Sequence, residues 1–400
     1  MKSKVLKEVN KVYKIEHPSF YTKITKKNLI KLINAREKLL LNLKLPKKIF
    51  YNSSLLDLGS GSGIYSLIYN IFGANTELVE YEKKFTNQSK KLFKKFAKHK
   101  NYKIINSDVF KYKTNKKFQI VVFNGVAHHT QNPKKILNNA CKFLDKKGFI
   151  IYGIGNKSGF FQRALQRLIL YKISQNENET VANAKILFKD HLQRAKKFGG
   201  RSINQIIYDT YINPKIDCQS TKEITEIFEK NKMILYSAFP QLNYNKSFLN
   251  LDIKNYRNFN IKNSYKKIKN EIYLSEHDWL TNSDSSKKNK IKKEIFKLEQ
   301  LKNNLSSEVN DKNFNNFNIN YKKISRLSKD YKENLKYLNE INIFNTDYQE
   351  KFFDELIELF KLLKKNNCNL KKMIFFLKKT KFIFKGTVGI GMNYYVGYKL

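Results

Sequence analysis

The spacing of hydrophobic residues changes along the chain, and each spacing indicates a type of secondary structure. Residues 28–43 carry apolar side chains at helical spacing, and they predict an N-terminal helical segment over residues 1–50. From residue 54 onward, short apolar runs alternate with amphipathic helical patterns, which indicates an α/β fold with a mostly parallel sheet and helices on both faces. The expected strands are residues 54–58, 76–81, 102–106, 118–123 and 148–154, and the expected helices are residues 63–72, 83–98 and 133–144.

The second half of the chain is more irregular. A helix at residues 220–231 and a strand at residues 232–238 continue the α/β rhythm, and the glycine-rich end of the chain predicts a last strand near residues 387–399. These patterns predict a helical segment at 1–50, a main domain at 51–240 with a possible substrate lid at 156–219, a helical region rich in lysine and asparagine at 241–380, and a final strand within 381–400.

A glycine-rich turn follows the first expected strand and opens a helix. Residues 55–63 read LLDLGSGSG, with glycines at positions 59, 61 and 63. Glycine lets the backbone turn sharply and approach a ligand closely, and the N–H groups of the following helix favour an anion such as an amino-acid carboxylate. Asp57 precedes the first glycine by two residues and is placed to anchor the turn and a ligand's ammonium group.

Two acidic residues follow the next two strands. Glu80 ends the second strand, about twenty residues after the turn, where a carboxylate can accept both hydroxyls of a ribose. Asp108 follows the third strand and can accept a hydrogen bond from an adenine amino group. A dinucleotide-binding dehydrogenase would need GxGxxG, but Ile64 occupies the position of its third glycine. The pattern therefore favours a pocket for adenosine with a charged amino-acid tail.

The run from Leu55 to Ile154 resembles the class I S-adenosylmethionine-dependent methyltransferases. The resemblance rests on LLDLGSGSG, on the acidic positions, and on FQIVVFNGVAHHTQNPKKIL followed by CKFLDKKGFIIYG. It implies a seven-stranded Rossmann-like sheet with an antiparallel last strand, a large helical insertion before that strand, and S-adenosylmethionine as cofactor. The cofactor contacts that it implies are Asp57, Gly59, Ser60, Gly61, Gly63, Glu80, Tyr81, Asp108, Val109 and Asn124.

Candidate catalytic residues follow the fourth strand, because open α/β sheets bind ligands at the carboxyl ends of their strands. Histidine can take a proton from a hydroxyl group near neutral pH, so His129 and His128 are candidate bases, with His129 preferred. The alternative is that they cap the loop or pack under the cofactor. The Asn/Asp-Pro-Pro-Tyr sequence of many enzymes that methylate amines or amides does not follow this strand, which favours O- or C-methylation of a small molecule.

Substrate contacts are expected in the segment after the fifth strand. Tyr208, Asp209 and Tyr211 could line a pocket there, although a helical core with exposed polar tips explains the same pattern. Residues 160–173 form a basic amphipathic pattern that predicts either contact with a membrane surface or, more commonly, packing on the sheet.

Composition changes this picture in three ways. The net charge is +44, but only seven of the 78 basic residues are arginine, so base-composition bias explains the lysine excess better than a polyanionic partner does. The three cysteines lie far apart and suggest neither a disulfide framework nor a metal site, which fits a reducing cytoplasm. No secretory signal or transmembrane stretch is expected.

Three functions remain open from the sequence. The first is a methyltransferase that acts on a small molecule. The second, supported only by charge, is an RNA methyltransferase. The third is a cofactor-binding scaffold that has lost catalysis and uses its helical region for interactions.

Overall fold

The structure, a computed structural model, describes most of the chain in two compact units. The sheet unit comprises residues 19–155, 219–268 and 392–400, and the helical unit comprises residues 1–18, 156–218 and 269–391. The residues described within them are 8–9, 11–12, 15, 24–157, 159–199, 201–239, 288–310, 319–340, 347–384 and 392–400.

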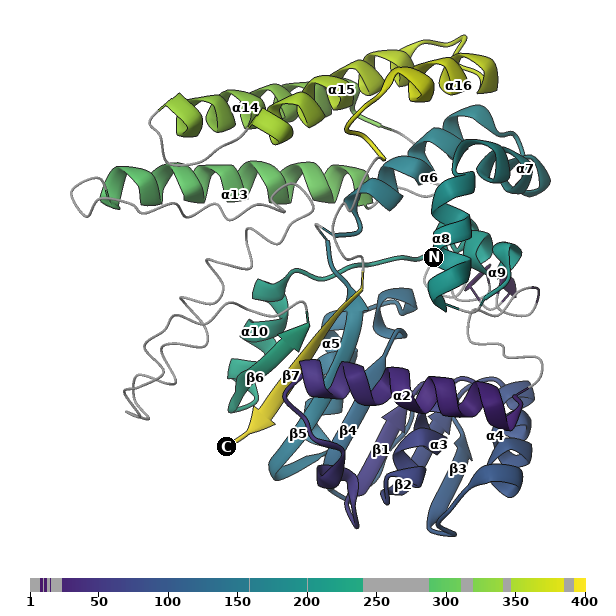
Figure 1. The fold of residues 1–400 in the computed structure, drawn as a ribbon. Helices are drawn as coiled ribbons and strands as arrows, with labels where there is room; N and C mark the ends of the chain where they lie inside the picture. The colour runs from purple at the N-terminus through teal and green to yellow at the C-terminus, as the bar shows by residue number, and fades with distance from the viewer. Residues whose placement is uncertain are drawn as a thin grey trace. The chain divides into compact units, whose positions relative to one another are not determined.

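Seven strands form the sheet of the first unit (Figure 1). Their order is β3-β2-β1-β4-β5-β7-β6, and every neighbouring pair is parallel except those that involve β7. The prediction of a seven-stranded Rossmann-like sheet with an antiparallel last strand is therefore confirmed. The strands are β1 Ser54–Leu58, β2 Asn75–Glu80, β3 Tyr102–Asn106, β4 Phe118–Asn124, β5 Leu144–Gly155, β6 Met233–Phe239 and β7 Met392–Lys399.

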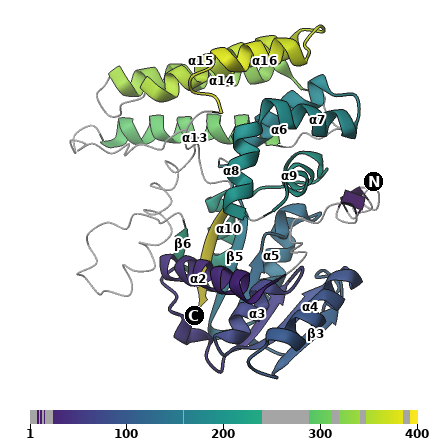
Figure 2. The same cartoon turned by 45° about the vertical axis from the view of Figure 1, so that its right-hand side comes forward.

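Helices cover both faces of this sheet, as the alternating pattern predicts. Leu55, Ile120 and Val122 point to the face that α2 packs on, while Leu56 and Val121 point to the opposite face. The views in Figures 1 and 2 agree that α2, α3 and α4 lie on one side and α5 on the other. The helices of the unit are α2 Lys26–Asn42, η1 Lys47–Phe50, α3 Ile64–Ile71, α4 Lys83–Phe96, η2 Ala127–His129, α5 Pro133–Lys142 and α10 Thr221–Lys230.

Local sequence signals explain where several helices begin. Asn132 caps α5, because its side chain accepts a hydrogen bond from the N–H of Lys135 at 2.9 Å, and Pro133 occupies the first turn. Ser220 and Glu223 form a capping box at the start of α10. These signals are local, and the bounds predicted for both helices agree with the structure to within two residues.

The helical unit has its own apolar core, in which segments far apart in the sequence meet. Leu165 and Leu168 of α6 share it with Leu335 of α14 and Leu356 of α15. The structure thus groups residues 156–218 with the helices beyond residue 287, a grouping that the sequence interpretation did not make. The helices are α6 Phe161–Ile173, α7 Glu177–Leu187, α8 Lys189–Gly199, α9 Ile203–Ile207, a π turn Tyr208–Ile212, α13 Lys288–Asn310, α14 Tyr321–Glu340, α15 Asp347–Lys364 and α16 Leu370–Lys379.

Helix α6 corrects one prediction. It is buried on almost every side, and even Arg167 is only 3% exposed. Arg167 donates to the Tyr171 hydroxyl at 2.8 Å and to the carbonyl of Asn213 at 3.1 Å, so a position that reads as polar surface is part of a core. Helix α6 is therefore part of the core of the helical unit and not the exposed amphipathic helix that the pattern suggested.

Two further predictions concern membrane-spanning helices and parts of the chain that the structure does not describe. Over the described ranges, no helix is long and apolar enough to cross a membrane. Residues 241–287, the first part of the predicted lysine-rich region, lie outside the described residues, as do residues 387–391 at the start of the predicted last strand.

Candidate active site

The strand order places the predicted motifs together. Strand β1 pairs in parallel with β2 on one side and with β4 on the other, so the connections that leave β1 and β4 run to opposite sides. In open parallel sheets, ligands bind at the carboxyl ends of the strands at such a reversal. The glycine turn follows β1, and the segment from Asn124 to His129 follows β4, so both lie at this edge.

The three glycines of the turn have left-handed backbones. The φ angles are +70° at Gly59, +55° at Gly61 and +74° at Gly63, which L-residues adopt only with strain. A Cβ on Gly59 would lie 2.7 Å from Cγ2 of Val126, and one on Gly63 would lie 2.6 Å from Oγ of Ser89. The sequence interpretation assigned this room to a ligand, but at Gly59 and Gly63 the protein itself fills it.

Glu80 ties the turn to the neighbouring strand. Its Oε2 accepts a hydrogen bond from the N–H of Gly61 at 2.7 Å, and its Oε1 accepts one from the N–H of Glu82 at 3.0 Å. Burial raises the pKa of Glu80, and backbone hydrogen bonds from Glu82, Gly61 and Tyr81 act in the opposite direction. A carboxylate has about four acceptor positions, so the group can still accept a hydroxyl proton.

Residues near Glu80 shape the next part of the edge. Asn106, which the sequence interpretation missed, donates to the carbonyls of Glu80 at 3.0 Å and Tyr81 at 2.7 Å and so fixes the end of β2. Tyr81 is 52% exposed. Asp108 caps its own turn by accepting from the N–H of Phe110 at 2.8 Å, and the adjacent Val109 packs on the core.

Asp57 lies under α3 with little access to water. It is 4% exposed, and its Oδ2 accepts a hydrogen bond from the hydroxyl of Ser66. Burial raises the pKa of Asp57 to about 6, although the bond from Ser66 and the positive charge of Arg36 lower it. The second oxygen, Oδ1, accepts no hydrogen bond from the residues that the structure describes, which leaves it available to an ammonium group.

Arg36 is a second residue that sequence reasoning missed. It lies on α2, is 4% exposed, and stacks on the ring of Tyr65 with its Cζ 3.8 Å from the ring centroid. Within the described parts of the chain, its guanidinium donates no hydrogen bond and forms no ion pair. A buried guanidinium in this state can bind an anion at little further cost, because its own desolvation has already occurred.

A signal for Arg36 exists in the sequence. The apolar stripe of α2 includes the buried Leu29 and Leu40, and Arg36 lies between them on the same helical face. It is also the first arginine of a chain in which lysine greatly outnumbers arginine.

Several polar atoms at this edge are buried without a hydrogen-bond partner among the described residues. They are the hydroxyls of Ser60 and Ser62 and Oδ1 of Asn124. A ligand with hydroxyl and amino groups would satisfy such atoms, since native structures rarely leave them unpaired. A Cβ added to Gly125, which has φ +74°, would meet no atom within 4 Å, so open space adjoins the end of β4. The donors, acceptors and space present fit an aminoacyl nucleoside.

The two candidate bases lie in η2, directly after β4. His128 and His129 are each 8% exposed, and their ring centroids are 4.1 Å apart. The turn is fixed by the N–H of His129, which donates to the carbonyl of Val126 at 3.0 Å, and by the hydroxyl of Thr130, which donates to the carbonyl of Ala127 at 2.7 Å. The structure thus brings both imidazoles to the strand end where they are expected.

The predicted substrate residues belong to the helical unit. Tyr211 is completely buried there, and its hydroxyl donates to Gln166 at 2.8 Å, which favours the structural alternative for this residue. Asp209 forms an ion pair with Arg201 at 2.7 Å. The hydroxyl of Tyr208 donates to Glu177 at 2.6 Å.

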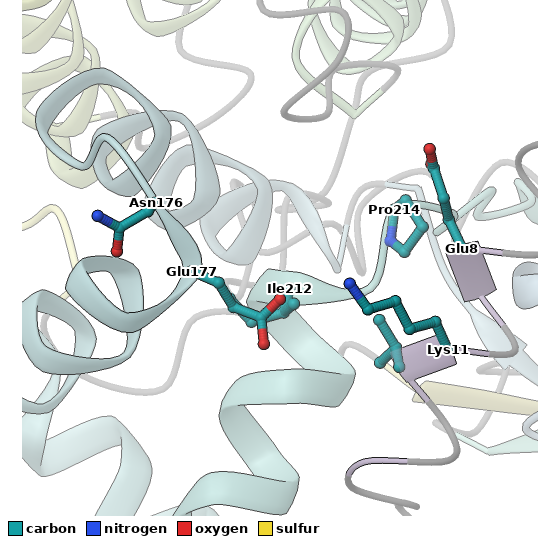
Figure 3. A pocket seen from close by; sticks show the side chains of 7 residues that line it. Glu8, Lys11, Asn176, Glu177, Ile212 and Pro214 are labelled. Carbon is teal, nitrogen blue, oxygen red and sulfur yellow. The ribbon is translucent and has the colours of Figure 1, made fainter.

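Glu177 also lines a hollow of about 290 Å³ in the helical unit (Figure 3). Lys11 and Glu8 reach it from the N-terminal segment, and Asn176, Ile212 and Pro214 complete the labelled wall. Acidic and basic side chains line it together, so its charge favours no one class of ligand. Among the described residues, no group of His, Cys, Asp and Glu side chains could hold a metal ion.

A family model now identifies the domain. Residues 31–206 match the model described as a methyltransferase domain. These residues are a methyltransferase domain. The match confirms the prediction of a methyltransferase domain, and the strand order agrees with the predicted Rossmann-like fold. The matched range begins in α2, includes the glycine turn and both histidines, and ends in α9.

Solved structures similar to this methyltransferase share little sequence with it. PKMT2 from Rickettsia typhi, in complex with AdoHcy, is 16% identical with a TM-score of 0.39, over 51% of this chain and 43% of that protein. A putative methyltransferase from Bacillus halodurans is 14% identical with a TM-score of 0.32, over 53% and 71%. Magnesium protoporphyrin IX methyltransferase from Synechocystis is 11% identical with a TM-score of 0.32, over 58% and 85%. No curated protein matches the sequence.

The turn can be tested by substituting Gly61. In Gly61→Val a β-branched residue would have to adopt φ +55°, at a cost of about 1–2 kcal/mol, and its side chain would enter the turn. We expect calorimetry to detect no binding of S-adenosylhomocysteine.

A matched control is Gly73→Val, since Gly73 has φ +105° and lies at the opposite edge, before β2. It should lower the melting temperature but leave the affinity unchanged. Unaltered affinity in Gly61→Val would contradict the assignment of the turn.

The raised pKa of Asp57 predicts how cofactor affinity depends on pH. An ammonium group binds the ionised carboxylate, and with a pKa of about 6 Asp57 becomes protonated as the pH falls through 6. The dissociation constant of S-adenosylhomocysteine should therefore rise by about tenfold for each pH unit below 6, measured by calorimetry from pH 8 to pH 5.

The same raised pKa acts oppositely on folding. Because the folded pKa exceeds the unfolded value of 3.8, the contribution of Asp57 to stability declines as the pH rises from 4 to 6. Asp57→Asn should flatten the binding profile below pH 6, and a native profile that is already flat there would refute the role.

Proposed function

We propose that this methyltransferase transfers the methyl group of S-adenosylmethionine to an oxygen or carbon atom of a small molecule. The observation that carries the proposal is the pair of buried histidines at the end of β4, next to the strand that leads into the glycine turn. A hydroxyl acceptor, or an acidic carbon acceptor, must lose a proton, and an imidazole at this position can take it.

The cofactor supplies a methyl group on a sulfonium, which is already electrophilic. The protein must therefore hold the acceptor in line, remove its proton and exclude water. Holding two reactants in this way can supply effective molarities of up to about 10⁵–10⁸ M. Burial of Asp57, Arg36 and both histidines provides an environment with little water in which these interactions are strong.

We propose which residues hold the cofactor from the contacts and unused acceptors at this edge. Glu80 accepts the ribose hydroxyls, with Tyr81 and Val109 beside the adenine and Asp108 accepting from its amino group. Asp57 binds the ammonium and Arg36 the carboxylate of the aminoacyl part. This division of roles is supported by the lone pairs left on Glu80 and Asp57 and by the guanidinium of Arg36 that lacks an acceptor among the described residues.

Arg36 can be tested with a pair of ligands. Arg36→Met should weaken S-adenosylhomocysteine binding by about tenfold to a hundredfold, as expected when a charge-assisted hydrogen bond is lost. Binding of 5′-methylthioadenosine, which lacks the amino-acid carboxylate, should not change.

Arg36→Lys retains the positive charge and should recover part of the affinity, which separates a ligand contact from a defect in packing on Tyr65. If both ligands weaken equally in Arg36→Met, Arg36 stabilises the fold and does not bind the carboxylate.

His129 is tested by turnover. His129→Ala should lower turnover by about 10²–10⁴-fold, because a positioned base is lost, while the affinity for S-adenosylhomocysteine stays the same. His128→Ala measures the contribution of the second imidazole, and His99→Ala, at an exposed position in the segment between α4 and β3, is the control. Full activity in His129→Ala would remove this residue from the mechanism.

The acceptor class is tested with labelled cofactor. Incubation of the protein and labelled S-adenosylmethionine with a metabolite extract should yield a labelled small molecule that is soluble in organic solvent. Label in RNA would establish the RNA methyltransferase instead. Cofactor binding without transfer to any extract would establish the inactive scaffold. Three free cysteines suit a reducing compartment, so a cytoplasmic extract is the first choice.

A further inference from the structure

The hollow in the helical unit is not used by the proposed cofactor site or by the proposed reaction. Its volume of about 290 Å³ lies near the lower limit for small-molecule sites, about 300–1,000 Å³, so it suits a ligand of the size of an amino acid. Two segments far apart in the sequence form it: residues 8, 11 and 12 from the N-terminal segment, and residues 176, 177, 212 and 214. All of them belong to the helical unit, so the hollow lies within one compact body.

One part of the wall of the hollow is apolar. Val12 is 7% exposed and Ile212 is 6% exposed, and Pro214 continues the same lining. A surface of this kind binds the hydrocarbon part of a ligand, because contact removes apolar area from water. The wall therefore selects a ligand that carries an apolar group.

Lys11 brings a positive charge to the hollow. Its side chain forms no ion pair and no hydrogen bond with the residues that the structure describes. Figure 3 shows its ammonium group pointing across the hollow toward Glu177, whereas the carboxylate of Glu8 points away from both. The ammonium group of Lys11 is therefore free to donate to an anionic group of a ligand.

Glu177 brings a negative charge that the protein already holds in position. It is the first residue of α7 and is partly buried, and the hydroxyl of Tyr208 donates to its Oε1 at 2.6 Å. Its Oε2 accepts no hydrogen bond and forms no ion pair across the described ranges. Tyr208, which the sequence predicts as a substrate contact, is not in the lining and instead orients this carboxylate. The free oxygen can accept from a cationic group of a ligand.

The charges of Lys11 and Glu177 lie in one hollow without forming an ion pair. Their sum favours no one class of ligand, but their separation does, because an anion alone would be repelled by Glu177 and a cation alone by Lys11. We propose that the hollow binds a small zwitterion with an apolar side chain, that is, an apolar amino acid. Its carboxylate accepts from Lys11, its ammonium group donates to Oε2 of Glu177, and its side chain contacts the apolar wall. This ligand site is additional to the proposed methyltransferase reaction.

Three matched ligands test the site in the full chain. Leucine carries both charges, 4-methylpentanoate lacks the ammonium group, and 3-methylbutylamine lacks the carboxylate. Saturation with S-adenosylhomocysteine keeps leucine out of the cofactor site. Methyl-labelled valine reports Val12 in the wall, and Val12→Ala assigns its resonance. Leucine should shift this resonance saturably, with a dissociation constant of about 1 mM or tighter, and each single-charge analogue should bind at least about tenfold more weakly.

Two variants assign each charge of the ligand to its partner. Glu177→Gln keeps an acceptor for the Tyr208 hydroxyl but removes the negative charge, so leucine should lose its advantage over 4-methylpentanoate. Lys11→Met keeps an apolar stem but removes the positive charge, so leucine should lose its advantage over 3-methylbutylamine. The control is Lys185→Met, at an exposed position of α7 outside the lining, and it should keep both preferences.

Three results would overturn the site. The first is a Val12 resonance that shows no saturable shift with leucine. The second is a single-charge analogue that binds the native protein as tightly as leucine does. The third is a preference for leucine that stays unchanged in Glu177→Gln or in Lys11→Met. Because the resonance reports the helical unit and no methyl transfer is measured, a failure of the proposed methyltransferase reaction leaves this titration unaffected.

Discussion

The hydrogen bond from the N–H of Gly61 to the carboxylate of Glu80 joins the ends of two strands and determines the rest of the edge. It is 2.7 Å long and buried, and a buried bond to an ionised group contributes about 1.5–3 kcal/mol. Gly61 has a left-handed backbone, which directs its N–H toward β2. Glu80 is the last residue of β2, and its side chain is buried rather than turned toward solvent. The same bond orients the Glu80 carboxylate, so the turn and the group that we propose binds the ribose cannot be positioned separately.

Burial at this edge makes the charges interdependent. Asp57 and Arg36 are each 4% exposed, and each influences the other without forming an ion pair. If they were paired, the desolvation cost of both would be offset within the protein and neither would need a ligand. Held apart, they match a zwitterion, with an acceptor for its ammonium and a donor for its carboxylate. The separation of these two charges explains how the chain would bind the aminoacyl end of the proposed cofactor.

The sequence predicts the sheet well because its signals there are local. Strand and helix periods, the cap at Asn132 and the spacing from Gly59 to Glu80 all act over short stretches, and the structure agrees with them. Contacts between distant segments were not predictable in this way. Helix α6 reads as amphipathic because its two arginines are polar, but Arg167 is buried by partners 4 and 46 residues away. Gly59 and Gly63 were predicted correctly as turn residues, but for the wrong neighbour, since Val126 and Ser89 lie far along the chain.

The arginines show how a composition bias can be used. A net charge of +44 spread over lysines says little about function, because solvated lysines can accumulate without structural consequence. Arginine at a buried position is different, since its desolvation must be offset by an acceptor. Arg167 has neutral acceptors within its own unit and is explained by the fold. Arg36, which is 4% exposed, has no acceptor among the described residues, and a ligand could supply one. Because arginine is scarce in this chain, a buried arginine points to a position where the fold or a ligand requires a guanidinium group. The many lysines reflect base composition instead.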